Sequence, residues 1–271
     1  AGIEGEELAA VGIATQRETT LLWDAATGEP VDRAIVWQDR RTTDRIEALD
    51  DDERALIRER TGLAPDAYFS ATKLEWLLDR DRRRERAAAG ELRAGTVDAW
   101  LLARLTGAHV TDPTNASRTM LFDVEDCAWD DELLDLFSVP RACLPTVRPS
   151  SVATPYGHTD PDGAFGARVP VTGALGDQQA ALFGQACFEA GEAKNTYGTG
   201  SFLLTNTGTE PARSEHGLLT TVAYQLADEA PRYALEGSIF VTGAALDWLA
   251  AVGVVESAAA TAAPARAVDS P

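Results

Sequence analysis

The sequence predicts an α/β protein, because short apolar segments of strand character alternate with longer segments of helical character. Hydrophobic residues make up 45% of the 271 residues. A chain of this length and composition can bury a substantial core, either in one large domain or in two smaller ones.

In the first half, a short helix is possible at residues 6–10, and strands are predicted at residues 11–14, 20–23 and 34–37. Residues 40–60 have helical periodicity. Ser70 or Thr72 can cap the next helix, and Thr96 can cap a clearer one that stops at Gly107.

In the second half, helices are predicted at residues 129–137, 178–187 and 241–252. In the last of these, Leu246 and Leu249 should point inward. Residues 145–166 are rich in proline, glycine and serine and indicate an ordered loop region. Strand character returns at residues 195–206, and a hairpin should pair residues 218–224 with 233–235.

The chain is strongly acidic, with a formal net charge of −19. This charge argues against nucleic acid as a partner, and against docking on anionic membranes. Lysine occurs only at Lys73 and Lys194, and arginine supplies the other positive charges. Such a composition suits a halophilic surface at high salt, where dense carboxylates keep a protein hydrated, but an ordinary acidic enzyme remains an equal alternative.

Cysteine and histidine give no sign of a disulfide framework or a metal site. The three cysteines lack a Cys-x-x-Cys spacing, and the three histidines are scattered. No apolar stretch approaches the roughly 20 residues that span a bilayer. The acidic opening of the chain does not resemble a signal peptide, so we expect a cytoplasmic protein without membrane insertion.

Two loops suggest phosphoryl transfer to an alcohol. Asp177 lies in the segment GDQQ at residues 176–179, and Thr199 lies in YGTG at residues 197–200. A carboxylate can accept the proton of a substrate hydroxyl, while glycines let backbone N–H groups approach phosphate closely. Each loop alone is weak evidence, because such turns are common.

Several longer segments strengthen the assignment, and they occur in family order. The chain resembles the glycerol kinases of the FGGY carbohydrate kinase family from residue 11 to at least 248, in TQRETT (15–20), IVWQDRRT (35–42), TNASRTM (114–120), GDQQAALFG (176–184) and KNTYGTG (194–200). The resemblance implies an actin/hexokinase-like (ribonuclease H-like) sugar kinase fold. It places the substrate domain at residues 1–184 and a partial nucleotide domain at residues 185–271.

The resemblance also implies a reaction: ATP, with Mg²⁺, phosphorylates glycerol to sn-glycerol 3-phosphate. Matched residue by residue, Asp177 is the general base, and Thr199 and Gly243 touch the nucleotide. The residues that match glycerol contacts are Arg17, Glu18, Trp37, Tyr68, Asp177, Gln178 and Phe202. No residue is assigned to a metal.

The residue types themselves support these roles. A triol needs both donors and acceptors: Arg17 offers a rigid fork of donors, and Glu18 and Asp177 accept. On a strand, the adjacent Arg17 and Glu18 would point to opposite faces, whereas a turn would let them converge.

The chain departs from the family pattern at both ends. It lacks the Asp-x-Gly-Thr-Thr hairpin that opens the family and most of the nucleotide domain, so we expect a fragment that is inactive alone. Asp247 stands where the family usually has glutamine, so that nucleotide contact is not carried over. The full-length protein is expected to be a homo-oligomer.

Two alternatives stay open. The first is an FGGY kinase for another polyol or sugar, such as xylulose or erythritol. The second is a non-catalytic domain that binds a polyol or serves as an assembly module.

Overall fold

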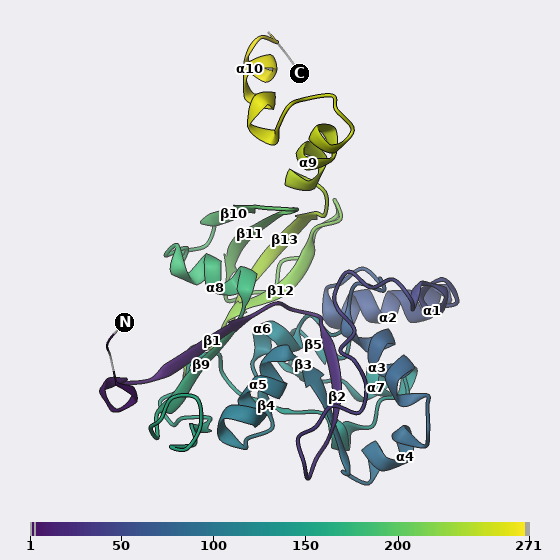
Figure 1. Cartoon of the computed structure of the whole chain (residues 1–271). Helices are drawn as coiled ribbons and strands as arrows, with labels where there is room; N and C mark the ends of the chain where they lie inside the picture. The colour runs from purple at the N-terminus through teal and green to yellow at the C-terminus, as the bar shows by residue number, and fades with distance from the viewer. Residues whose placement is uncertain (1, 3, 269–271) are drawn as a thin grey trace.

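The computed structural model of the chain describes Gly2 and residues 4–268. A helix-rich part built from the N-terminal segments lies below a twisted antiparallel sheet, and a long two-stranded ribbon connects the two (Figure 1). The C-terminal helices α9 (Gly243–Ala251) and α10 (Ala262–Arg266) stand away from the sheet. Among all the residues that the structure describes, no helix combines the length and apolarity needed to cross a membrane.

The connecting ribbon pairs two segments that lie far apart in the sequence. Strands β1 (Val11–Thr15) and β9 (Pro170–Gly176) run parallel, with Thr15 opposite Gly176, and β8 (Gly157–His158) pairs antiparallel to β9. Because parallel strands end at the same edge, the residues that follow β1 and β9 emerge side by side. These residues include Arg17 and Asp177.

The strands predicted at residues 11–14 and 20–23 are confirmed, but the one at 34–37 is wrong. Strand β2 (Thr20–Asp24) pairs with β3 (Leu92–Thr96), whereas Ile35 makes only an isolated bridge to Thr20. The N–H of Trp37 donates instead to the Thr19 hydroxyl at 3.2 Å. At the N-terminus, the expected helix is a 3-10 turn (Gly5–Glu7).

The predicted helix at residues 40–60 is two helices, because Asp50 starts a new one. Its side chain accepts from the Glu53 N–H, and the Glu53 side chain accepts in return, which forms a capping box. The helices of the helix-rich part are α1 (Thr43–Glu47), α2 (Asp51–Thr61), α3 (Ser70–Leu78), α4 (Arg83–Ala88), α5 (Val97–Thr106), α6 (Pro113–Ala116) and α7 (Asp131–Leu136).

The expected caps are partly correct. Thr96 is the N-cap of α5, but its hydroxyl donates to Asp98 rather than capping the helix. Gly107 ends α5 in the left-handed conformation, with φ 76°, as predicted. Neither Ser70 nor Thr72 caps α3: the N-cap is Phe69, and the Ser70 hydroxyl donates to the carbonyl of Glu18.

The second sheet has the strand order β10-β11-β13-β12, and it confirms the predicted hairpin between β12 and β13. Its strands are β10 (Ala193–Tyr197), β11 (Ser201–Gly208), β12 (Leu219–Tyr224) and β13 (Arg232–Ile239). Helix α8 (Asp177–Gly184) packs on this sheet through Leu182, in a cluster with Leu204 and Ala234.

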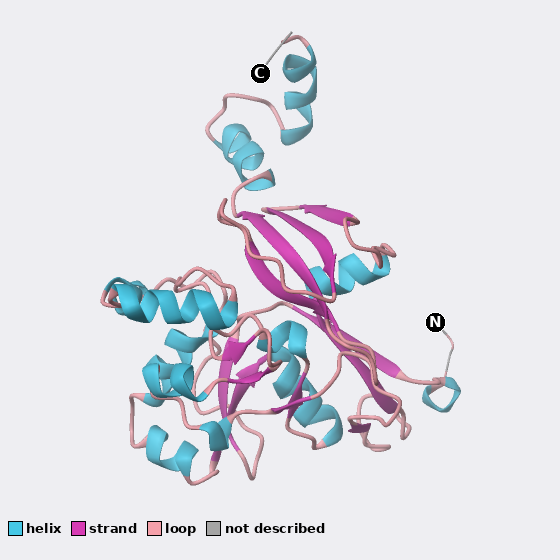
Figure 2. Cartoon of the chain, turned by 180° about the vertical axis from the view of Figure 1, so that it is seen from behind, coloured by secondary structure: helices cyan, strands magenta, loops and turns pink. Residues whose placement is uncertain are grey.

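Helix α9 is confirmed, but the inward position of Leu246 is wrong. Leu246 is 37% exposed and Trp248 is 62% exposed. No residue of α9 is buried, because the helix projects beyond the edge of the sheet (Figure 2).

Residues 145–166 form the expected ordered loop region, tied down by short pairings. These pairs are β7 (Thr146–Val147) with β4 (Val110–Thr111), and β8 with β9. Elsewhere, β5 (Phe122–Asp123) pairs with β6 (Ala128–Trp129). Two further 3-10 turns are Arg141–Cys143 and Ala258–Thr261. The most extensive apolar cluster fills the helix-rich part around Phe69, Leu77 and Phe137, which gives the site a rigid base.

Candidate active site

A small pocket lies where the ends of β1 and β9 meet the second sheet. Its lining consists of Gln16 and the seven residues predicted to contact substrate, namely Arg17, Glu18, Trp37, Tyr68, Asp177, Gln178 and Phe202. Its volume is about 60 Å³, far below the roughly 300–1,000 Å³ of sites for drug-sized ligands. The pocket therefore suits a molecule of a few heavy atoms.

Arg17 and Glu18 converge because the chain turns directly after β1. Glu18 has φ 60°, in the left-handed region, which costs a non-glycine residue roughly 1–3 kcal/mol. Hydroxyls of Thr20 and Ser70 donate to its carbonyl at 2.9 and 3.1 Å and hold the turn. Arg17 Nε lies 3.8 Å from Glu18 Oε1, so the turn that permits convergence is present.

Glycine is required at position 176 for Arg17 to reach the pocket. An added Cβ at Gly176 would lie 2.8 Å from Cγ and Cδ of Arg17. The N–H of Gly176 donates to Thr114 Oγ1 at 2.8 Å, which ties the end of β9 to α6. The conformation of β9 and the path of the Arg17 side chain therefore depend on each other.

The charged groups of the pocket belong to a buried network with two residues that sequence reasoning missed. Glu236 on β13 accepts from Arg17 Nη1 at 2.5 Å and from Arg17 Nη2 at 2.9 Å. Arg118 donates to Glu18 at 2.8 Å and to Glu236 at 3.1 Å. All four side chains are at least 98% buried.

This network fixes the charge states of its members. Burial alone would raise the pKa of Glu236, but the guanidinium groups of Arg118 and Arg17 outweigh it and lower the pKa to about 2. Burial opposes the charge of Arg17, yet Glu236 and Glu18 hold its pKa above the usual value. Arg17 is therefore a permanently charged donor.

A sequence signal existed for both missed residues. Arg118 lies inside the recognised segment TNASRTM, and Glu236 interrupts the apolar pattern of β13. A charged side chain that is fully buried, as Glu236 is, requires a partner. That partner, Arg17, lies 219 positions away, so local patterns could not identify it.

Asp177 is the first residue of α8 and directly follows β9. Its Oδ1 lies 3.7 Å from Arg17 Nε and accepts from the Gln178 N–H at 2.8 Å. The side chain is 47% exposed. The carboxylate thus faces both the pocket and open space, as a proton acceptor that meets two reactants would require.

Aromatic rings form the apolar wall of the pocket. The Trp37 ring meets Tyr68 at 5.8 Å and Phe202 at 6.5 Å between centroids, edge to face in both cases. Sequence reasoning missed Phe240, which lies 5.4 Å from Tyr68 and is 49% exposed. Burial, more than any neighbouring charge, raises the pKa of Tyr68, so its hydroxyl stays protonated.

Thr199 and Gly243 do not line this pocket, but the structure brings them together beside it. The N–H of Gly243 donates to Gly198 O at 3.0 Å, and the N–H of Ala244 donates to Thr199 O at 3.2 Å. An added Cβ at Gly243 would lie 2.4 Å from Gly198 O, so glycine is needed here for close backbone packing. Strand β11, which carries Phe202, begins directly after this turn.

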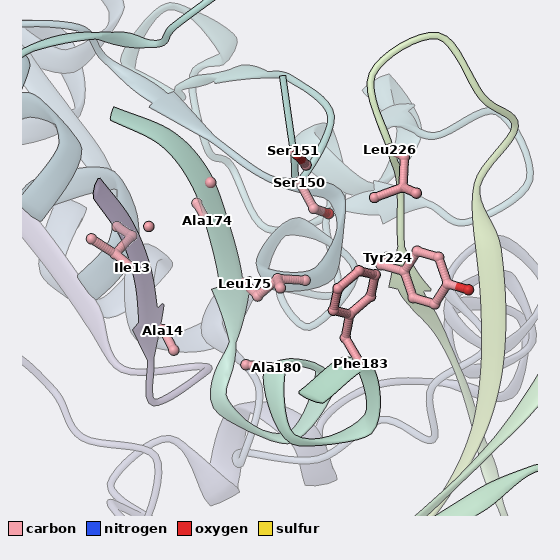
Figure 3. A pocket seen from close by; sticks show the side chains of 12 residues that line it. Ile13, Ala14, Ser150, Ser151, Ala174, Leu175, Ala180, Phe183, Tyr224 and Leu226 are labelled. Carbon is pink, nitrogen blue, oxygen red and sulfur yellow. The ribbon is translucent and has the colours of Figure 1, made fainter. Parts of the chain in front are cut away.

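A second cavity, of about 330 Å³, lies against β1 and β9 (Figure 3). It is mainly apolar, with Phe183, Tyr224 and Leu226 facing small residues of the two strands. None of the residues predicted for substrate or nucleotide lines it. Despite its greater volume, it lacks the convergent charged groups that chemistry requires.

No group of three or more histidine, cysteine, aspartate and glutamate side chains that could hold a metal is found within residues 2 and 4–268. Asp177 is the carboxylate of the pocket that is open to solvent, whereas Glu18 is engaged by Arg118. Any divalent cation at this site would therefore depend on oxygen ligands from a bound phosphate and from water.

Residues 1–184 match the N-terminal domain of the FGGY family of carbohydrate kinases, and residues 193–269 match its C-terminal domain. The chain belongs to the FGGY family of carbohydrate kinases.

Curated relatives carry more specific names. The chain is 61% identical to a glycerol kinase of Haloferax volcanii over 282 residues, which covers 100% of this chain and 55% of the relative. It is 59% identical to one of Halobacterium salinarum, again covering 55% of that relative. The chain thus spans about half the length of the curated relatives it matches. Both are haloarchaeal, which agrees with the high-salt interpretation of the acidic composition.

Solved structures of the family share the fold. Plasmodium falciparum glycerol kinase with ADP superposes with a TM-score of 0.84 at 36% identity, covering 92% of this chain and 50% of that one. A xylulose kinase of Rhodospirillum rubrum gives 0.76 at 23% identity, covering 93% and 51%. The actin/hexokinase-like fold expected from the sequence is confirmed.

Proposed function

We propose that the protein containing this chain is a glycerol kinase, which transfers the γ-phosphoryl group of ATP to glycerol. The products are sn-glycerol 3-phosphate and ADP. The observation that carries the proposal is the pocket of about 60 Å³ in which all seven candidate substrate residues meet. The named relatives at 61% and 59% identity support the same substrate.

The pocket matches a triol in size and polarity. Arg17 supplies donors while Glu18 and Asp177 accept, and Trp37 and Phe202 cover the carbon atoms. A ligand that leaves a buried polar group such as Arg17 or Glu18 unpaired loses roughly 1–3 kcal/mol. Charge and shape together therefore favour glycerol over molecules that lack a hydroxyl.

Asp177 is the proposed general base. Its carboxylate takes the proton of the terminal hydroxyl as that oxygen bonds to the γ-phosphorus and the bond to the β-γ bridging oxygen breaks, releasing ADP. Because the transition state is loose, alignment and charge neutralisation contribute more than proton removal. Arg17 Nε, 3.7 Å from Asp177 Oδ1, helps to orient that carboxylate.

The turn that carries Thr199 and the start of α9 at Gly243 are the proposed contacts to the nucleotide. The backbone hydrogen bonds that join these two segments, beside the start of the strand that carries Phe202, support this assignment. Mg²⁺ supplies charge neutralisation on the phosphates, and in kinase sites it is commonly held by one or two carboxylates together with phosphate oxygens. Asp177 would hold the ion only through a bound water, because a general base needs a free carboxylate oxygen.

We further propose a cytoplasmic, homo-oligomeric full-length protein, with the substrate domain at residues 1–184 and the nucleotide domain beginning at residue 185. The use of free ATP supports a cytoplasmic location. The buried ion pair between Arg17 and Glu236 supports a fixed orientation of the two domains, because it joins residues from each.

A kinase for another polyol or sugar is the second candidate. The xylulose kinase structures share the fold at 23% identity or less, and the size of the pocket favours the smaller substrate. A polyol-binding domain without catalysis would keep the pocket and lack phosphoryl transfer.

The test compares ATP-dependent phosphorylation of glycerol, erythritol and D-xylulose by the complete gene product. Glycerol should have the highest kcat/KM. Asp177→Asn should lower kcat by about 10²–10⁴-fold, the usual contribution of a general base, while the Kd for glycerol changes little. An unchanged kcat would remove Asp177 from the mechanism, and a preference for xylulose would favour the second candidate. Glycerol binding without turnover of any substrate would favour the binding domain.

A further inference from the structure

Both lysines of the chain are buried. Lys73 is 0% exposed and Lys194 is 2% exposed, although lysine is among the residues least often buried because its ammonium group is strongly hydrated. Arginine supplies the positive charge elsewhere. A lysine retained inside such a protein needs local compensation for its lost hydration.

Lys194 finds that compensation at the edge of the candidate site. From β10 its Nζ donates to Gln178 Oε1 at 2.5 Å, to Thr196 Oγ1 at 3.0 Å and to the carbonyl of Phe202 at 3.1 Å. An ammonium group has three N–H donors and no acceptor, so this arrangement uses all of them. Two of the three acceptors belong to residues that line the pocket.

The contact with Lys194 determines which way the Gln178 amide faces. Because Nζ can only donate, the amide must turn its oxygen toward the lysine. Its NH₂ group then faces the other way, where Nε2 lies 3.3 Å from Asp177 Oδ2. The pocket thus has a donor, Gln178, directly beside its acceptor, Asp177.

This pair of groups suits a reacting hydroxyl. An alcohol oxygen accepts one hydrogen bond through a lone pair while its proton is donated to a base. If the Gln178 amide were reversed, its oxygen would face both the substrate oxygen and the Asp177 carboxylate. Three acceptors would then compete for one proton.

We propose that Lys194 is a positioning residue that fixes the donor group of Gln178 toward the substrate hydroxyl next to Asp177. The proposal rests on the proposed function and deepens it: Lys194 makes the pocket specific for an alcohol that accepts and donates at the same oxygen. Lys194 itself stays on the outer side of Gln178 and touches no reacting atom.

A double-mutant cycle tests this role, with glycerol binding to the 271-residue chain measured by calorimetry. Lys194→Met and Gln178→Ala should each weaken binding by about tenfold, the effect of one lost hydrogen bond to a charged or oriented group. The double variant should bind within about threefold of Gln178→Ala, because Lys194 acts through Gln178. Lys194→Arg should not restore affinity, because a planar fork cannot reach three acceptors around one point.

Two controls separate positioning from loss of stability. Lys73→Met removes the other buried ammonium, which donates to the Tyr68 carbonyl at 2.5 Å. Because Lys73 does not act through Gln178, the fold-changes in glycerol Kd from Lys73→Met and Gln178→Ala should multiply in the double variant. Leu102→Ala opens a cavity in the apolar cluster beside β1 and β9, so it should lower the Tm while leaving glycerol affinity unchanged.

Independent effects of Lys194→Met and Gln178→Ala would overturn the proposal. If Lys194→Met does not fold, Gln178→Glu gives the answer, since it keeps a partner for Lys194 but presents only acceptors; unchanged glycerol affinity in that variant would also overturn it.

A readout without ligand separates this inference from the proposed function. The side-chain NH₂ resonances of Gln178, assigned by their loss in Gln178→Glu, should shift in Lys194→Met and stay in place in Leu102→Ala. If the wild-type chain binds no glycerol but the resonances still shift in Lys194→Met, the result would contradict the proposed function and support the orienting role. Resonances that do not move would overturn the orienting role, whatever the chain binds.

Discussion

The two carboxylate oxygens of Glu236, on β13, accept hydrogen bonds from Arg17 and Arg118 in the other part of the chain. One of its oxygens accepts from Arg17 Nη2, Arg118 and Ser238, and the other accepts from Arg17 Nη1. Removing one partner from such a buried network leaves uncompensated charge on the others. The residue therefore stabilises the fold and orients the Arg17 donors of the pocket.

We predict that Glu236→Gln lowers the free energy of unfolding by about 3–5 kcal/mol at neutral pH and weakens glycerol binding. The pKa of Glu236 falls from an ordinary 4.5 to about 2 on folding, so its ionised form stabilises the protein fully above the unfolded pKa. That contribution is lost as pH falls toward 2.

Urea unfolding of both proteins at a series of pH values measures this effect. The difference between wild type and Glu236→Gln should be constant near neutral pH and shrink below about pH 4.5. A difference that does not change with pH would show that the carboxylate charge is not the source of the stabilisation.

At the scale of elements, the ends of the helices depend on glycine for two different reasons. Gly107 ends α5 with φ 76°, and no atom lies within 4 Å of where its Cβ would be. Gly62 ends α2 with φ 71°, but its Cβ would lie 2.6 Å from Thr220 Cβ on β12. The first position requires only a left-handed backbone, whereas the second also requires close packing between α2 and the second sheet.

Gly107→Ala should therefore cost about 1–2 kcal/mol, the price of a left-handed alanine, and Gly62→Ala should cost clearly more. The free energy of unfolding from denaturant titration measures both changes. Equal costs would mean that β12 moves aside freely at Gly62.

Elements with complete local signals were predictable from the sequence. Helix α5 has a periodic apolar face and a glycine stop, and the strand-like segments at residues 218–224 and 233–235 predicted the hairpin of β12 and β13. Residues 34–37 had strand-like composition, but only Ile35 found a partner. The site residues came from the family resemblance. Glu236 lies outside the recognised segments, and Lys194 lies inside one of them, but the contacts of both side chains are specified by no local pattern.

At the scale of the molecule, the net charge of −19 is the dominant feature. Carboxylates at this density repel one another and oppose the compact state at low salt. Raising ionic strength from 0.1 to 1 M shortens the Debye length from about 10 to 3 Å and screens this repulsion.

We predict that the Tm of the chain rises as KCl increases from 0.1 to 1 M. Calorimetry or circular dichroism melts measure the shift, with equal osmolarity of sucrose as the control for exclusion effects. The difference between wild type and Glu236→Gln should persist in high salt, because buried pairs are screened much less than surface charges. A Tm that is independent of KCl would contradict a salt-adapted surface.

The burial of Lys73 and Lys194 has a practical consequence. Reagents that acylate or alkylate primary amines find no accessible side chain while the protein stays native, and a protease that cuts after lysine has no site to engage. The rate of labelling or cleavage at these two lysines would therefore report how often the protein opens locally. Because both lysines lie next to the pocket, no introduced probe is needed to follow opening there.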